Sequence, residues 1–178
     1  MAKQLLGKEV TAALNERIKA KVAQLAEKGI QPTLGIIRVG ENESDLSYER
    51  GATKRCQTLG VACEKILLPA DVSQDELLKV IDEVNKNDAI HGVLLFRPLP
   101  KHLDQNVIEN ALDPAKDVDC MTDGSMSGVF TGKAIGYPPC TPQACMEILE
   151  HYGIDCTGKK AVDDENLFTI GEGVNGFF

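Results

Sequence analysis

The sequence predicts an α/β fold: a parallel sheet flanked by helices in a single three-layer domain, followed by the aborted start of a second domain. Two observations predict this fold. Short apolar runs alternate with longer amphipathic stretches along the 178 residues, an order typical of parallel sheets. Hydrophobic residues make up 43% of the chain and charged residues 26%, a balance that allows one buried core.

The predicted strands are short runs rich in apolar residues, and glycine or proline follows each run within two residues. Continuous apolar runs of this kind are typical of parallel strands buried on both faces. In such sheets the ligand lies beyond the carboxyl ends of the strands, so the loops after Val39, Leu68 and Phe96 are the expected site. The predicted strands are residues 33–39, 61–68 and 92–96.

The predicted helices carry apolar residues at a spacing of three or four, beside residues that favour helix ends. Gly60 ends the second helix, and its N-cap is expected at Ser44 or Asp45. Thr141 followed by Pro142 predicts the start of the last helix, with a hydroxyl cap and proline at the first helical position. The predicted helices are residues 10–25, 44–59, a helix beginning at Ser73, 107–111 and 141–152.

The formal net charge of −8 argues against nucleic acid as a partner, because phosphate neutralisation requires clustered lysine and arginine. No segment has the length and apolarity of a signal peptide or a membrane span, so a cytoplasmic protein with no membrane partner is expected. The six cysteines and three histidines show no spacing typical of zinc, so we expect reduced thiols and no metal. A local basic group can still hold a small anion; the candidates are Arg50, Lys54, Arg55, Arg97 and Lys101.

Four short patterns fall in or near the expected loops. They are residues 44–55, which contain Tyr48, then Phe-Arg-Pro-Leu-Pro-Lys-His at 96–102, Lys-Asp-Val-Asp at 116–119, and Pro-Pro-Cys-Thr-Pro at 138–142. Together and in this order, over residues 5–162, they resemble the methylenetetrahydrofolate dehydrogenase/methenyltetrahydrofolate cyclohydrolase family, the FolD-type enzymes. The resemblance implies a catalytic domain that binds folate beside a Rossmann domain that binds NADP, and a homodimer in intact members.

Position by position, the resemblance implies that Tyr48 is the active-site tyrosine, which packs on the folate, and that Asp119 hydrogen-bonds the pterin ring. A carboxylate suits that role because it accepts two parallel N–H bonds from an aminopyrimidinone edge. From the residues alone, a core tyrosine with its hydroxyl at the surface and a capping aspartate are the simpler interpretations. The substrate-binding residues implied are Tyr48, Ala52, Leu95, Phe96, Arg97, Pro98 and Asp119.

Two positions depart from the family pattern. The family motif places a lysine, tied to the cyclohydrolase step, one helical turn after the tyrosine, and this chain has Ala52 there. A glutamine that supports the lysine is replaced by Phe96. Lys54 is a doubtful substitute because it lies about 120° around the helix from Tyr48. Arg55 is nearly two turns away, and its guanidinium stays protonated.

The expected domain boundary lies at residue 157. Residues 1–157 are the catalytic domain, and residues 158–178 are a truncated or aberrant start of the NADP-binding domain. A strand is predicted to open at residues 158–162, but the polar run after it predicts a tail from about Asp163 that is disordered or irregular. The Gly-x-Gly-x-x-Gly pattern at residues 171–176 has no following helix to hold a pyrophosphate, so we interpret it as coincidental.

Three functions stay open. The first is NADP-dependent oxidation of 5,10-methylenetetrahydrofolate to the methenyl form by the intact enzyme, with cyclohydrolase activity lost or weak and this chain alone inactive. The second is a non-catalytic module that binds folate or dimerises, and the third is an unrelated flavodoxin-like signalling domain. Cys140 lies beside a helix N-terminus, which lowers a thiol pKa, but no histidine is an obvious partner, so nucleophilic catalysis is not expected.

Overall fold

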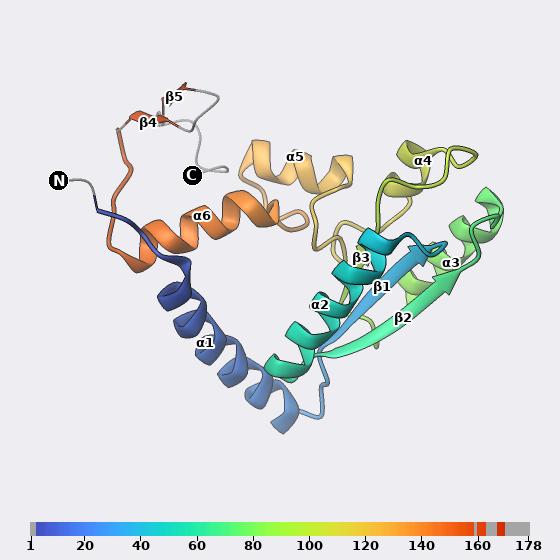
Figure 1. The fold of residues 1–178 in the computed structure, drawn as a ribbon, viewed down its shortest axis with the longest axis horizontal. Coiled ribbons are helices and arrows are strands. Elements are labelled where there is room, and N and C mark those ends of the chain that lie inside the picture. The colour runs from blue at the N-terminus through green and yellow to red at the C-terminus, as the bar shows by residue number, and fades with distance from the viewer. Residues whose placement is uncertain (1–2, 159, 163–166, 170–178) are drawn as a thin grey trace.

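The centre of the fold is a three-stranded parallel sheet, as predicted. Its strands are β1 (Thr33–Val39), β2 (Ala62–Leu68) and β3 (Gly92–Leu95). They lie in the order β2-β1-β3, with Val39 opposite Leu68 and Ile37 opposite Leu95, so the carboxyl ends meet at one edge (Figure 1). The computed structural model describes residues 3–158, 160–162 and 167–169.

All but one of the helices were predicted to within a turn. The exception is α5 (Asp123–Thr131), whose sequence contains two glycines and no apolar stripe. Gly128 lies so close to the backbone of Ile135 that no larger side chain fits. This contact accounts for the presence of glycine inside the helix, although glycine disfavours helix formation. The other helices are α1 (Gly7–Glu27), α2 (Glu43–Leu59), α3 (Gln74–Lys86), α4 (Gln105–Asn110) and α6 (Cys140–His151).

Two predicted N-caps are wrong. The cap of α2 is Asn42, whose side chain accepts a hydrogen bond from the backbone N–H of Ser44. Asparagine satisfies this free N–H as well as serine or aspartate does, so composition alone does not select among them. Helix α6 begins at Cys140, so Thr141 lies inside it and makes no cap, and Pro139 precedes it without a capping side chain. Gly60 does end α2, in the left-handed conformation.

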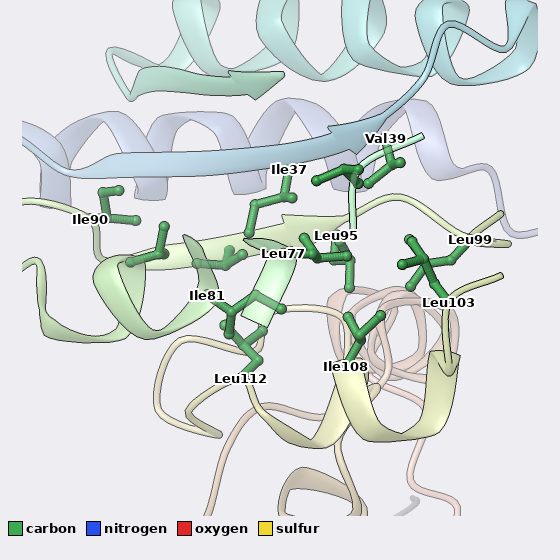
Figure 2. Close-up of a cluster of buried hydrophobic side chains, with 13 residues drawn as sticks. Ile37, Val39, Leu77, Ile81, Ile90, Leu95, Leu99, Leu103, Ile108 and Leu112 are labelled. Carbon is green, nitrogen blue, oxygen red and sulfur yellow. The ribbon is translucent and has the colours of Figure 1, made fainter. Parts of the chain in front are cut away.

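The helices form the two outer layers of the predicted three-layer arrangement. Helix α2 covers one face of the sheet, with α1 packed against it and α6 against α1, and α3 and α4 cover the other face (Figures 1 and 2). Leu77 and Ile81 of α3 are fully buried against the sheet. The cluster drawn in Figure 2 consists of Ile37, Val39, Val72, Leu77, Ile81, Val84, Ile90, Val93, Leu95, Leu99, Leu103, Ile108 and Leu112.

The predicted new strand is present as β4 (Lys160–Val162). It pairs antiparallel with β5 (Leu167–Thr169). The prediction of a disordered or irregular tail is therefore wrong for residues 167–169, where Phe168 and Thr169 favour a strand. Residues 163–166 and 170–178, including the glycine pattern at 171–176, lie outside the described residues.

Helix α3 depends on a capping box at its N-terminus. The Ser73 hydroxyl accepts from the N–H of Glu76 at 3.3 Å, and the Glu76 carboxylate accepts from the N–H of Ser73 at 3.1 Å. We expect Ser73→Ala to lower the free energy of unfolding by about 1 kcal/mol, measured by urea denaturation. Ser47→Ala, at an exposed position inside α2, is the control and should change stability by less than about 0.5 kcal/mol. Equal losses in both variants would contradict the capping role.

Candidate functional site

A cavity of about 310 Å³ lies at the carboxyl edge of the sheet, between α2 and the loop after β3. The loop after Phe96 is one of the three loops at which the ligand site was expected. The loops after β1 and β2 border a different cavity of about 380 Å³, which contains Arg38 and Pro69. The first cavity is lined by Ser44, Asp45, Tyr48, Leu94, Leu95, Phe96, Arg97 and Asp119.

Two aromatic rings form one wall of the cavity. The ring centroids of Tyr48 and Phe96 are 5.5 Å apart, and the ring planes meet at 82°, the edge-to-face arrangement that aromatic pairs prefer. Phe96 is 8% exposed, whereas Tyr48 is 62% exposed. Tyr48 is therefore not a core tyrosine: Phe96 supports it, and its ring is open to a flat ligand.

Helix α2 is fixed to the sheet by the residue next to Tyr48. The carboxylate of Glu49, almost completely buried, accepts from Nε of Arg38 at 2.8 Å and from Nζ of Lys65 at 2.8 Å. These bonds, with that from Lys65 the larger influence, hold the pKa of Glu49 below its ordinary value, against the opposing effect of burial. Glu49 thus ties α2 to β1 and β2 and sets the position of Tyr48.

The loop that carries Asp119 is organised by the buried side chain of Asp117. Asp117 Oδ2 accepts from the N–H of Thr122 at 2.8 Å, and Oδ1 accepts from the N–H of Met121 at 3.1 Å. Burial alone would raise the pKa of Asp117, but these hydrogen bonds outweigh it and keep the pKa low. Lys116 Nζ donates to the carbonyls of Val84 and Asn87. Most of the Lys-Asp-Val-Asp pattern is therefore scaffold, and Asp119 is the member that lines the cavity.

Arg97 is not a free cation. Its guanidinium donates to Oδ2 of Asp119 at 2.9 Å and to Oε1 of Glu109 at 3.1 Å. Desolvation tends to lower the pKa of Arg97, but the two carboxylates raise it. Arg97 was expected from sequence as a possible anion-binding group and, through the resemblance, as a substrate-binding residue. This pairing was not foreseen, because Glu109 lies twelve residues away on another element.

Of the substrate-binding residues that the resemblance implied, the structure places five along one cavity: Tyr48, Leu95, Phe96, Arg97 and Asp119. The other implied residues lie at its margin: Ala52 is half-buried one turn beyond Tyr48, and Pro98, joined to Arg97 by a cis peptide bond, is exposed. Neither is among the residues that line the cavity, and nor is Lys54, which is exposed on α2.

Sequence reasoning missed three lining residues, Ser44, Asp45 and Leu94. Ser44 and Asp45 were interpreted only as caps, although the first turn of a helix at the carboxyl edge of a sheet faces the ligand position. Their place in the first turn of the helix could therefore have identified Ser44 and Asp45 as lining residues.

Cys140 does not have the environment of a nucleophile. Desolvation and the nearby carboxylates of Asp119 and Asp117 raise the pKa of its thiol, and its Sγ lies 3.5 Å from the carbonyl of Val118. The expected lowering by the helix N-terminus is outweighed, so the thiolate is disfavoured. All six cysteines are free thiols in the structure.

The cavity holds an exposed aromatic ring and a carboxylate at the carboxyl edge of an α/β domain, an arrangement suited to a flat heterocycle that donates N–H groups. A family model describing the tetrahydrofolate dehydrogenase/cyclohydrolase catalytic domain matches residues 5–119. This is more than half of the chain. The chain belongs to this family, which confirms the resemblance found in its motifs.

Relatives and solved structures agree with this assignment. The bifunctional protein FolD of Carboxydothermus hydrogenoformans is 47% identical over 162 residues, which cover 91% of this chain and 56% of the relative. That of Clostridioides difficile is 43% identical over 169 residues, covering 95% and 59%. The chain thus spans little more than half the length of these curated relatives.

The fold matches crystal structures of the same family. The bifunctional FolD enzyme of Campylobacter jejuni superposes with a TM-score of 0.82 at 34% identity, over 86% of this chain and 55% of that one. The Trypanosoma brucei dehydrogenase-cyclohydrolase (FolD), complexed with NADP cofactor and inhibitor, gives 0.78 at 28% identity, over 88% and 54%. In the part of the chain that the structure describes, no helix is long and apolar enough to cross a membrane.

Proposed function

We propose that this chain is the folate-binding part of a 5,10-methylenetetrahydrofolate dehydrogenase that uses NADP and has lost most or all cyclohydrolase activity. The observation that carries the proposal is that Tyr48 and Asp119 line the same cavity. The membership of the family and the relatives named FolD support the folate class of ligand. NADP is proposed from the Trypanosoma brucei relative, whose structure contains it.

Each proposed contact follows from the chemistry of its group. Tyr48 is 62% exposed, and its ring offers a flat apolar surface on which a pterin can stack. Asp119 lies across the cavity and offers carboxylate oxygens to the two N–H donors of an aminopyrimidinone edge. Together they fix the orientation of the ligand, and orientation is what a positioned substrate requires for hydride transfer.

The loss of cyclohydrolase activity is proposed from what lies near Tyr48. Hydrolysis of a methenyl bridge needs a group that transfers protons. Ala52 and Phe96 carry no such group, and Arg97 is paired with two carboxylates. Asp119 is reserved for the pterin edge in this proposal, so the described lining holds no ammonium group of the kind that the resemblance ties to the cyclohydrolase step.

NADP, when bound, accepts the hydride, and the described residues contribute only the folate side of that reaction. At this cavity, the described chain has no glycine-rich turn leading into a helix N-terminus, the usual site of a pyrophosphate. The residues described here therefore do not fit the cofactor. The boundary at residue 157, with NADP held by other residues, stays part of the proposal.

Binding and turnover of the 178-residue chain test the proposal together. Titration calorimetry under anaerobic conditions should show tetrahydrofolate binding that Asp119→Asn weakens by about tenfold or more. NADP-dependent oxidation of methylenetetrahydrofolate should be absent, because nothing described holds a nicotinamide against the folate. Asp82→Asn, exposed on α3, is the control.

Each outcome of this test has a definite meaning. Absence of tetrahydrofolate binding would contradict the folate site. Turnover by the chain itself would contradict the proposal that this chain binds folate and that other residues hold NADP. Folate binding without turnover, even when the chain is joined to the NADP-binding half of a relative, would favour a non-catalytic folate-binding or dimerisation module.

A further inference from the structure

Arg97 connects two carboxylates that come from different elements. Its Nη2 donates to Asp119 in the cavity wall, and its Nη1 donates to Glu109 on α4. The side chain of Glu109 is 12% exposed, whereas those of Arg97 and Asp119 are 34% and 32% exposed. The ion-pair network therefore runs from a nearly buried position into the cavity.

The far end of this network is itself fixed. Gln105 Nε2 donates to the same Glu109 oxygen at 2.9 Å, and Gln105 Oε1 accepts from the N–H of Leu99 at 3.3 Å. Gln105 and Glu109 lie on α4 one turn apart, so the guanidinium is held by a helix. A planar guanidinium fixes two acceptors at once, which the single ammonium of lysine does less well.

We propose that Arg97 is a positioning residue that orients Asp119 in advance for the N–H edge of the ligand and thereby sets the affinity for aminopyrimidinone ligands. This inference rests on the proposed folate site. Each carboxylate oxygen has two lone pairs, so Asp119 can accept from Arg97 on one side and from the ligand on the other. Without Arg97, ligand binding must also order the Asp119 side chain, and that ordering reduces affinity.

A double-mutant cycle on tetrahydrofolate binding tests this role. In titration calorimetry of the full chain, Arg97→Met should weaken binding by about tenfold. The same substitution in an Asp119→Ala background should have less than about a twofold effect, because the acceptor of the Arg97 hydrogen bond is then absent. Arg97→Lys should restore part of the affinity, since it keeps the charge and one hydrogen bond.

Two further variants separate positioning from a general effect on charge or folding. Glu109→Met removes the anchoring acceptor without changing a lining residue, and it should weaken binding by about threefold. Lys101→Met removes a positive charge from an exposed position in the same loop, and it should leave binding unchanged. Thermal unfolding of each variant shows whether the fold is retained.

The outcomes distinguish this inference from the proposal beneath it. Equal effects of Arg97→Met with and without Asp119 would overturn the positioning role while leaving the folate site standing. The same holds if Glu109→Met has no effect on binding. If the unmodified chain does not bind tetrahydrofolate, the proposed function fails and the inference fails with it.

Discussion

Introducing lysine at position 52 is expected to raise hydrolysis of 5,10-methenyltetrahydrofolate by about 10²–10⁴-fold, the usual contribution of general acid–base catalysis. Ala52 lies one helical turn beyond Tyr48, so a lysine there would extend along the same face of α2 toward the cavity. Its ammonium has a pKa that responds to burial and neighbours, as proton transfer requires. Hydrolysis needs no hydride acceptor, so the loss of methenyl absorbance can be followed with this chain alone.

Phe96 should limit the effect of the new lysine. Its ring, 8% exposed and packed against Tyr48, cannot accept a hydrogen bond from an ammonium. We therefore expect Ala52→Lys with Phe96→Gln to exceed Ala52→Lys alone. Ser47→Lys, exposed on α2, controls for added charge. If the unmodified chain already hydrolyses the methenyl compound rapidly and Lys54→Ala abolishes this, Lys54 has taken the role and our interpretation of Ala52 is wrong.

Replacing Glu49 by alanine is expected to lower the free energy of unfolding by about 3–5 kcal/mol at neutral pH, the usual cost of breaking a buried ion pair. Arg38, only 4% exposed, would lose its carboxylate partner. Lys65 is partly exposed and can turn to water. Urea denaturation measures the loss. Glu83→Ala, which removes an exposed ion pair with Lys79, should cost less than about 1 kcal/mol.

The contribution of Glu49 should also depend on pH. Hydrogen bonds from Lys65 and Arg38 keep the pKa of this carboxyl below its ordinary value of 4.5. Its stabilising contribution is therefore complete above about pH 4.5 and is lost as the pH falls through the lower pKa of the folded state. The Glu49→Ala variant should lose less stability than the unmodified chain over this acid range. Parallel losses in both proteins would contradict the role of Glu49.

The sheet could be predicted from sequence because its signals are local. The run at residues 33–39 is apolar and ends at a glycine, and the strand has these bounds in the structure. The capping box at Ser73 is equally local. Helix α5 was missed because it contains glycine, which disfavours a helix. Gly128 is needed there because the backbone of Ile135 packs against it, and the spacing of residue types along the chain does not reveal that contact.

The sequence named several residues of the candidate cavity but not the ion pairs that connect them. Family motifs placed Tyr48 and Asp119, which the structure brings to one cavity. The anchor Glu49 was read only as part of a motif, because its partners Arg38 and Lys65 lie on strands that the sequence does not align in register. The bridge from Arg97 to Glu109 depends in the same way on how α4 packs beside the loop. Long-range charge pairing follows from the fold and cannot be obtained from spacing along the chain.

A crystal structure of the chain with tetrahydrofolate tests the central claim most directly. The account predicts the pterin ring against Tyr48, with its aminopyrimidinone edge on Asp119 and the Arg97–Asp119 pair intact. The chain has other cavities that could take a ligand, one beside Arg38 and one between α1 and α6 near Arg17 and Glu147. Density for the ligand in either of these, with the cavity at Tyr48 empty, would contradict the account.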